Sequence, residues 1–228
     1  MNLGLRDALS RSPDHIPTVN DDVTFESGLP DALVACAERH RRRLVSSFIT
    51  RDEQPEKIWY ARGEAGWLRG ELLHRRLSTD GQLRWLTGMG AQIPAAVFSE
   101  VGRYDEQHFP QYVADGDLSL RALERVVRLA VELLSRIWNK TEESTHVIDC
   151  RLVTPGTFFL LFRSIRSSYQ LGMRLALYRG HWPAWIRPLV VAVLMLTSVI
   201  TGNRPQIVTT FNCSDRLPLA GPTRSLQG

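Results

Sequence analysis

The sequence predicts an α/β protein in which helices precede a small sheet. Residues 146–150 (HVIDC) form an apolar pulse typical of a buried strand, a helical stretch follows over 157–169, and residues 173–179 alternate large apolar and other side chains. Strand, helix and strand in this order predict a βαβ unit, whose strands are parallel and joined by a right-handed crossover. With 228 residues and 43% hydrophobic composition, the chain is long enough to bury a substantial core.

The first third of the chain predicts a lead followed by helices. Residues 1–30 are rich in Asp, Ser, Pro and Gly with poor periodicity, which favours a poorly ordered lead. Apolar residues then recur near helical spacing over residues 33–48 and 63–77. We therefore expect a helical N-terminal region over residues 31–84.

Three further elements are expected downstream. Residues 93–101 form a short apolar run with little helical character, which favours a strand. Residues 118–138 carry an apolar stripe opposite Arg and Glu side chains, which predicts a long amphipathic helix. Residues 206–211 (QIVTTF) predict one more strand, and residues 213–228 a C-terminal tail.

The most apolar segment is HWPAWIRPLVVAVLMLTSVITGNR, residues 181–204. Its continuous apolar run, residues 189–200, has 12 members, whereas a membrane span needs about 20. Such a run suits a core helix, or a helix that also borders lipid, a bound ligand or a partner protein. Both interpretations stay open on the pattern alone.

Charge and cysteine content limit the class of protein. The formal net charge is +4 with 28 basic and 24 acidic residues, which favours weak attraction to an anionic surface over nucleic-acid binding. The three cysteines are odd in number and have no CxxC pair, as expected for reduced thiols. No secretory signal is visible, so a cytoplasmic location is expected.

Catalytic patterns are sparse. The chain has no GxSxG elbow, no glycine-rich phosphate loop and no HExxH, and its six histidines are scattered. Asp149 ends a strand-like pulse, but no partner base or nucleophile accompanies it, so capping of the strand is the simpler interpretation. We therefore predict no catalytic residue, no metal ligand and no cofactor, and expect that the chain is not an enzyme.

The order of several motifs over residues 85–212 resembles the CRAL-TRIO lipid-binding domain, found in phosphatidylinositol/phosphatidylcholine-transfer proteins and tocopherol- and retinaldehyde-binding proteins. Four motifs carry the resemblance, together with the helix 118–138 and the strand 206–211: AAVFSEVGRYDEQHF at 95–109, HVID at 146–149, YQLGM at 169–173 and HWPAWIRPLV at 181–190.

The resemblance implies a small, mostly parallel sheet flanked by helices, with an apolar cavity closed by a gate helix. The implied function is non-catalytic binding, and transfer or presentation, of a hydrophobic lipid-like ligand during transient contact with a membrane. Where the family has a headgroup-binding glutamate and lysine, this chain has Leu171 and Gln206, so phosphatidylinositol specificity is not predicted. The residues expected to line the cavity are Phe158, Phe162, Met173, Leu175, Leu177, Trp182, Trp185, Val190, Val193, Leu194 and Ile200.

Three alternatives remain at this level. The chain could be a protein-interaction module that keeps the fold without a ligand and docks a partner through the helix at 189–200. It could be a hydrolase that works through Asp149 and a histidine, which requires a nucleophile within reach of a base. Finally, the segment 182–200 could anchor the chain permanently in a membrane.

Overall fold

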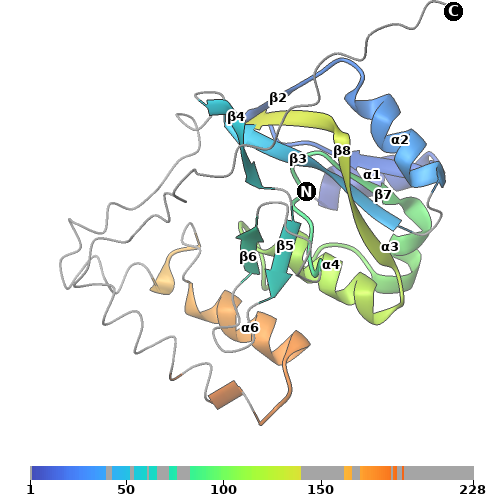
Figure 1. Ribbon diagram of the computed structural model, residues 1–228. Coiled ribbons are helices and arrows are strands. Elements are labelled where there is room, and N and C mark those ends of the chain that lie inside the picture. Colours follow the sequence, from blue (N-terminus) through green and yellow to red (C-terminus); the bar gives the residue numbers. More distant parts are fainter. Residues whose placement is uncertain are drawn as a thin grey trace, which may run out of the picture.

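The computed structural model describes residues 2–39, 43–51, 54–60, 62–65, 72–75, 83–139, 162–165, 170–185, 187–188 and 192. Helices and strands alternate irregularly along the chain (Figure 1). The elements are α1 (Asn2–Ser10), β1 (His15–Thr18), β2 (Val23–Phe25), α2 (Leu29–Arg39), β3 (Arg43–Arg51), β4 (Gln54–Tyr60), β5 (Arg62–Ala65), β6 (Leu72–Arg75), β7 (Ala91–Pro94), α3 (Ala95–Val101), α4 (Ala114–Glu124), β8 (Arg128–Asn139) and α6 (Leu171–His181).

A mixed sheet forms the centre of the fold, so the predicted α/β class is confirmed. Its strand order is β1-β7-β3-β8-β2, and β4 pairs with β3; β5 and β6 form a separate hairpin. Among the described strands, β3 and β8 pair in parallel, whereas the other pairings are antiparallel. The expected mostly parallel sheet is therefore wrong for this part of the chain.

Strand β3 is central because its side chains are buried on both faces. Leu44 packs into one apolar cluster, whereas Val45 and Ile49 pack into another, as expected when successive strand residues point to opposite sides. The second cluster includes the apolar face of α2, whose Leu29 and Leu33 are four residues apart. The first cluster takes residues of α1, α3 and α4.

The segment predicted as one long helix, residues 118–138, is divided into a helix and a strand. Helix α4 ends at Glu124, and Val126, at φ 62° and 83% exposed, turns the chain before β8 begins at Arg128. The apolar residues of β8 suit a strand because alternate members face alternate clusters: Leu129 and Val131 pack on the first cluster and Ala130 on the second. Pairing with β3 thus overrides the helical periodicity.

The N-terminal third also differs from the expected lead and helices. Residues 1–30 include α1, β1 and β2, and β1 is held by antiparallel pairing with β7. Beyond α2, the region predicted as helical contains β3 to β6. Short apolar runs fit both a helix and a strand, and distant pairing partners decide between them.

Two segments predicted as strands are mainly helical. Helix α3 follows directly on Pro94, which ends β7 and has no N–H to extend the strand ladder. Residues 173–180 belong to α6, which Gln170 caps by accepting a hydrogen bond from the Met173 N–H at 2.7 Å. Several predicted elements lie outside the described residues. They are the strands at 146–150 and 206–211, the helix at 157–169 except residues 162–165, and the gate helix at 189–200 except residue 192. Among the described helices, none combines the length and apolarity that a membrane crossing requires.

Candidate functional site

The first turn of α4 begins from a strained backbone position. Val113, the residue before the helix, has φ 71°, a left-handed conformation that costs a β-branched residue on the order of 1–3 kcal/mol. Its carbonyl accepts a hydrogen bond from the Asp117 N–H at 2.8 Å. This turn places two carboxylates, Asp115 and Asp117, in the first turn of one helix.

Asp115 ties α4 to the segment that precedes β7. One carboxylate oxygen accepts the Gly88 N–H at 2.8 Å, and the other accepts the Gly116 N–H at 2.9 Å. The Ser119 hydroxyl donates to the Asp115 carbonyl and accepts the Leu86 N–H at 3.1 Å. Two backbone amides therefore orient the Asp115 carboxylate. The Ser119 hydroxyl adds a further hydrogen bond between α4 and the segment at 86–88.

Tyr60 holds the segment at 85–88 from the sheet side. Its buried hydroxyl donates to the Trp85 carbonyl at 3.1 Å and accepts the Thr87 N–H at 3.2 Å. Its ring packs against Trp85 with centroids 5.5 Å apart. Burial, and secondarily the charge of Asp115, raises the pKa of the Tyr60 hydroxyl, which keeps it neutral as a hydrogen-bond donor.

Asp115 is a desolvated carboxylate in a half-buried residue. Burial raises the pKa of its carboxyl, although the hydrogen bonds from Gly88 and Gly116 act in the opposite direction. Burial, and secondarily the charge of Asp115, also raises the pKa of the nearby Tyr104 hydroxyl. A carboxylate with a raised pKa is a stronger base than an ordinary aspartate, which suits it to accept a proton from a substrate.

Asp117 has a different role, because both of its oxygens bind side chains. One oxygen accepts from Arg121 Nε at 2.9 Å, and the other lies 2.9 Å from Nε2 of His181 at the end of α6. His181 Nδ1 lies 3.0 Å from Glu124, and Arg121 also donates to the carbonyls of Val101 and Arg103. Asp117, Arg121, Glu124 and His181 form the α4–α6 clamp, which fastens α6 beside the first turn that carries Asp115.

The α4–α6 clamp predicts a pH-dependent stability. Burial opposes protonation of His181, but its hydrogen bonds to Asp117 and Glu124 outweigh burial and raise its pKa above the ordinary value of 6.5. The stabilisation is complete below about pH 6.5 and is lost as the pH rises through the folded-state pKa. Chemical denaturation at several pH values should show the wild type losing stability over this window relative to His181→Gln. Parallel curves for the two proteins would contradict the prediction.

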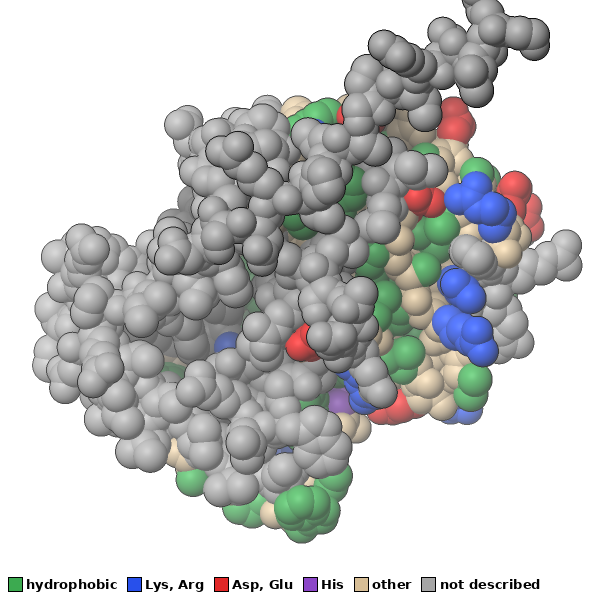
Figure 2. Space-filling view, in the orientation of Figure 1, with side chains coloured by type: hydrophobic (Ala, Val, Ile, Leu, Met, Phe, Trp, Pro, Cys, Tyr) green, Lys and Arg blue, Asp and Glu red, His purple; other side chains and the backbone are tan. Residues whose placement is uncertain are grey.

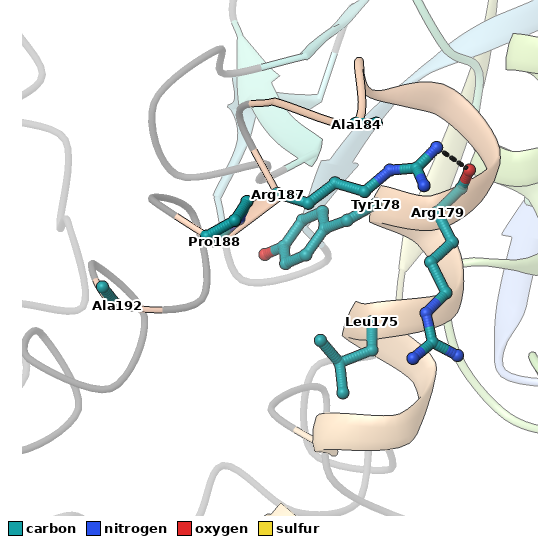
Figure 3. Close-up of a pocket in the computed structure, with 7 residues that line it drawn as sticks. All are labelled: Leu175, Tyr178, Arg179, Ala184, Arg187, Pro188 and Ala192. Atoms are coloured by element: carbon teal, nitrogen blue, oxygen red, sulfur yellow. Dashed lines mark hydrogen bonds between the residues drawn. The ribbon is translucent and has the colours of Figure 1, made fainter.

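A pocket of about 490 Å³ opens beside α6 (Figure 3). Its wall is largely apolar, and two arginines also contribute to it. Arg187 is braced across the end of α6, since Nε donates to the Trp182 carbonyl at 3.1 Å and a terminal nitrogen donates to the Arg179 carbonyl at 2.8 Å. The lining residues are Leu175, Tyr178, Arg179, Ala184, Arg187, Pro188 and Ala192.

The predicted cavity residues occupy different environments. Leu175 lines the pocket, whereas Met173, Leu177 and Trp182 are buried in a cluster with Phe109, Leu120 and Tyr178. The helical backbone explains the division: residues 173 and 177 share one face of α6, and residue 175 lies on another. Phe162 is half-buried and Trp185 is 74% exposed. The predicted members Phe158, Val190, Val193, Leu194 and Ile200 lie outside the described residues.

The sequence alone did not single out Asp115 as a chemical group. In the sequence, Asp115 and Asp117 are residues of a type suited to begin a helix, and His181 is one of six scattered histidines. The Asp-Gly-Asp spacing was the available signal, since it places two carboxylates in one helical turn. The contacts to Gly88 and His181 join segments far apart in sequence and leave no local pattern.

Among the described residues, no group of three or more His, Cys, Asp or Glu side chains is placed to hold a metal ion.

Comparisons with known proteins establish no family for the chain. No family model matches it, and no curated protein matches it. Among solved structures, the chain is similar to GalNAc-T7, whose crystal structure contains UDP, GalNAc and Mn²⁺. The two are 14% identical with a TM-score of 0.45, and the similarity covers 60% of this chain and 30% of that chain. The CRAL-TRIO resemblance therefore stays a prediction.

The expectation that the chain is not an enzyme is corrected by this comparison. GalNAc-T7 is a glycosyltransferase, and the likeness contradicts the non-enzyme prediction, which we do not retain. At this TM-score the likeness carries no substrate, cofactor or mechanism to the chain. Those must be argued from the site itself.

Proposed function

We propose that the chain acts as an enzyme in which the Asp115 carboxylate is the general base for transfer of a group to a hydroxyl. One observation carries the proposal: a carboxylate with a raised pKa, in a half-buried residue, oriented by the Gly88 and Gly116 amides. A surface aspartate lacks the desolvation that raises the pKa of the Asp115 carboxyl.

The proposed step is a displacement assisted by proton removal. As the substrate hydroxyl oxygen forms a bond to the transferred group, its proton passes to Asp115. The bond between that group and its leaving group breaks, and the leaving group keeps the electron pair. The amides of Gly88 and Gly116 hold the carboxylate in a defined orientation, which reduces the reorganisation needed for proton transfer.

The rest of the site supports this role by fixing the geometry around Asp115. Tyr60 secures the segment that contains Gly88, and the α4–α6 clamp secures the first turn of α4 from the other side. The carboxylate oxygen of a base must lie within about 2.6–3.2 Å of the oxygen that carries the proton, so small shifts of α4 are costly for the rate.

The experiment that tests the proposal is a transfer assay with activated donors. The full chain is incubated with nucleoside diphosphate sugars, acyl thioesters or nucleoside triphosphates together with hydroxyl-bearing acceptors, and products are detected by mass spectrometry. We expect transfer from one donor class, and its dependence on Asp115 decides whether that residue is the base. Transfer that is unaffected by Asp115→Asn would overturn the proposal.

A second proposal concerns the pocket beside α6. We propose that it binds a hydrophobic, lipid-like ligand, which keeps the ligand class predicted from the sequence but moves the site. The supporting observation is the largely apolar wall, to which Leu175 and Tyr178 of α6 contribute. Docking of a partner protein through residues 189–200 stays an alternative, because that segment lies almost wholly outside the described residues. A cytoplasmic location with transient membrane association likewise stays a proposal.

Leu175→Ser should weaken binding of a fluorescent fatty-acid probe to the pocket. Loss of one buried leucine side chain costs about 1.5–3 kcal/mol, which corresponds to a dissociation constant raised roughly 10- to 100-fold. Leu3→Ser is the matched control, because Leu3 is 79% exposed on α1. Equal affinities of the wild type and the Leu175 variant would contradict the proposed site.

A further inference from the structure

The part of the chain that contains the apolar pocket has a net positive charge because it lacks acidic residues. From residue 150 to residue 214 the sequence contains no Asp, Glu or Lys, whereas the rest of the chain has more acidic than basic residues. The overall net charge of +4 therefore does not show that this segment carries positively charged side chains alone. The basic residues of this segment are Arg151, Arg163, Arg166, Arg174, Arg179, Arg187 and Arg204.

Two of these arginines lie at the pocket beside α6. Arg179 is exposed, and Arg187 donates to the Trp182 carbonyl and to the Arg179 carbonyl. Figure 3 shows the second of these hydrogen bonds. Helix α6 has no acidic residue along its length. Figure 3 shows the Arg187 guanidinium directed at the end of α6 and the Arg179 side chain directed along the helix. An anionic ligand beside α6 would therefore meet basic side chains without an acidic side chain of α6 to repel it.

The turn after α6 places apolar groups at the surface beside these arginines. Trp185 is 74% exposed, and Pro183 and Ala184 are also exposed. Figure 2 shows hydrophobic side chains at the surface at the lower end of the view, where Figure 1 places the turn after α6. Tryptophan next to arginine is the pairing that favours the boundary between lipid headgroups and acyl chains.

We propose that the α6 pocket and the turn after it form a docking site for an anionic phospholipid surface. This inference rests on the proposed binding of a lipid-like ligand and specifies the class of that ligand. Arg179 and Arg187 contact the headgroup phosphate, Leu175 and Tyr178 contact the acyl chains, and Trp185 enters the interface. Charge complementarity selects an anionic headgroup over a zwitterionic one.

Vesicle flotation with the full chain tests the inference. The probes are vesicles of phosphatidylcholine alone and vesicles in which part of the lipid is phosphatidylglycerol. We expect the chain to float with the anionic vesicles and to be released by salt. Arg179→Gln should lower the affinity for the anionic vesicles about fivefold, the effect of one basic residue near an anionic surface.

The controls separate charge at the pocket from charge elsewhere. Arg11→Gln removes the same charge from an exposed ion pair between Asp7 of α1 and the residue that follows the helix, and it should leave flotation nearly unchanged. Trp185→Ser alters an exposed residue, so it should fold normally and still weaken binding. Circular dichroism melting of each variant confirms that the fold is retained.

Three results would overturn the inference. Equal flotation on both vesicle types removes the anionic preference, while the Leu175 probe experiment still decides whether the pocket binds an apolar ligand. Equal losses for Arg179→Gln and Arg11→Gln place the interaction outside the pocket. Saturable binding of inorganic phosphate without flotation identifies a soluble phosphate compound, rather than a membrane, as the source of the anion.

Discussion

Replacing Asp115 by asparagine should lower the rate of group transfer about 10²- to 10⁴-fold, the usual contribution of a general base. Asparagine has nearly the same shape, and its carbonyl oxygen can still accept a hydrogen bond from the Gly88 or Gly116 amide. It cannot accept a proton at neutral pH. The variant should therefore fold and bind substrate but turn over slowly, with the loss in kcat rather than in KM.

The pH profile separates catalysis from positioning. Because burial raises the pKa of Asp115, the wild-type rate should fall on the acid side at a pH above 3.8, the ordinary value for an aspartate, and the variant should lack this limb. Ser119→Ala is the matched structural control, since it removes the hydroxyl between Asp115 and Leu86 without a titrating group. An unchanged acid limb in Asp115→Asn, or an equal loss of rate in Ser119→Ala, would show that Asp115 acts only by holding the segment at 86–88.

Replacing Asp117 by alanine should destabilise the fold by about 3–5 kcal/mol, because it leaves buried charged partners without their counter-charge. The Asp117 side chain is 8% exposed, and its partners Arg121 and His181 are 23% and 5% exposed. For a chain of this size, such a loss corresponds to a melting temperature lowered by roughly 6–20 °C.

Limited proteolysis should locate the damage caused by Asp117→Ala. We expect earlier cleavage near α6, because the clamp is the charged contact between α6 and α4. Asp7→Ala is the control: its ion pair with Arg11 lies on the surface of α1, where such pairs contribute little. A melting temperature lowered no more by Asp117→Ala than by Asp7→Ala would show that the clamp does not stabilise the fold.

The sequence was most informative where burial leaves a strong local signal. The apolar residues of α2 recur at helical spacing, and the structure buries Leu33 and Cys36 against the sheet. The α/β class also follows from the mixture of periodicities. Composition also shows a segment without acidic residues between residues 150 and 214, on which the proposed lipid site depends.

The errors have a common cause in pairing between distant segments. The apolar residues of β8 fit a helical stripe, but β3 lies beside them and satisfies their backbone groups as a parallel strand. Residues 173–177 alternate as a strand would, yet no described strand pairs with them, and the Gln170 cap begins a helix instead. The local sequence pattern of a segment does not show which distant segment will pair with it.

The sequence by itself determined the α/β class, the absence of acidic residues between residues 150 and 214, and the presence of two carboxylates near residue 116. Only the tertiary structure decided what those carboxylates do. It placed Asp115 against the Gly88 amide, 27 residues away, and Asp117 against His181, 64 residues away. Desolvation and hydrogen bonding depend on which atoms surround a group, and those atoms come from segments that meet only when the chain folds.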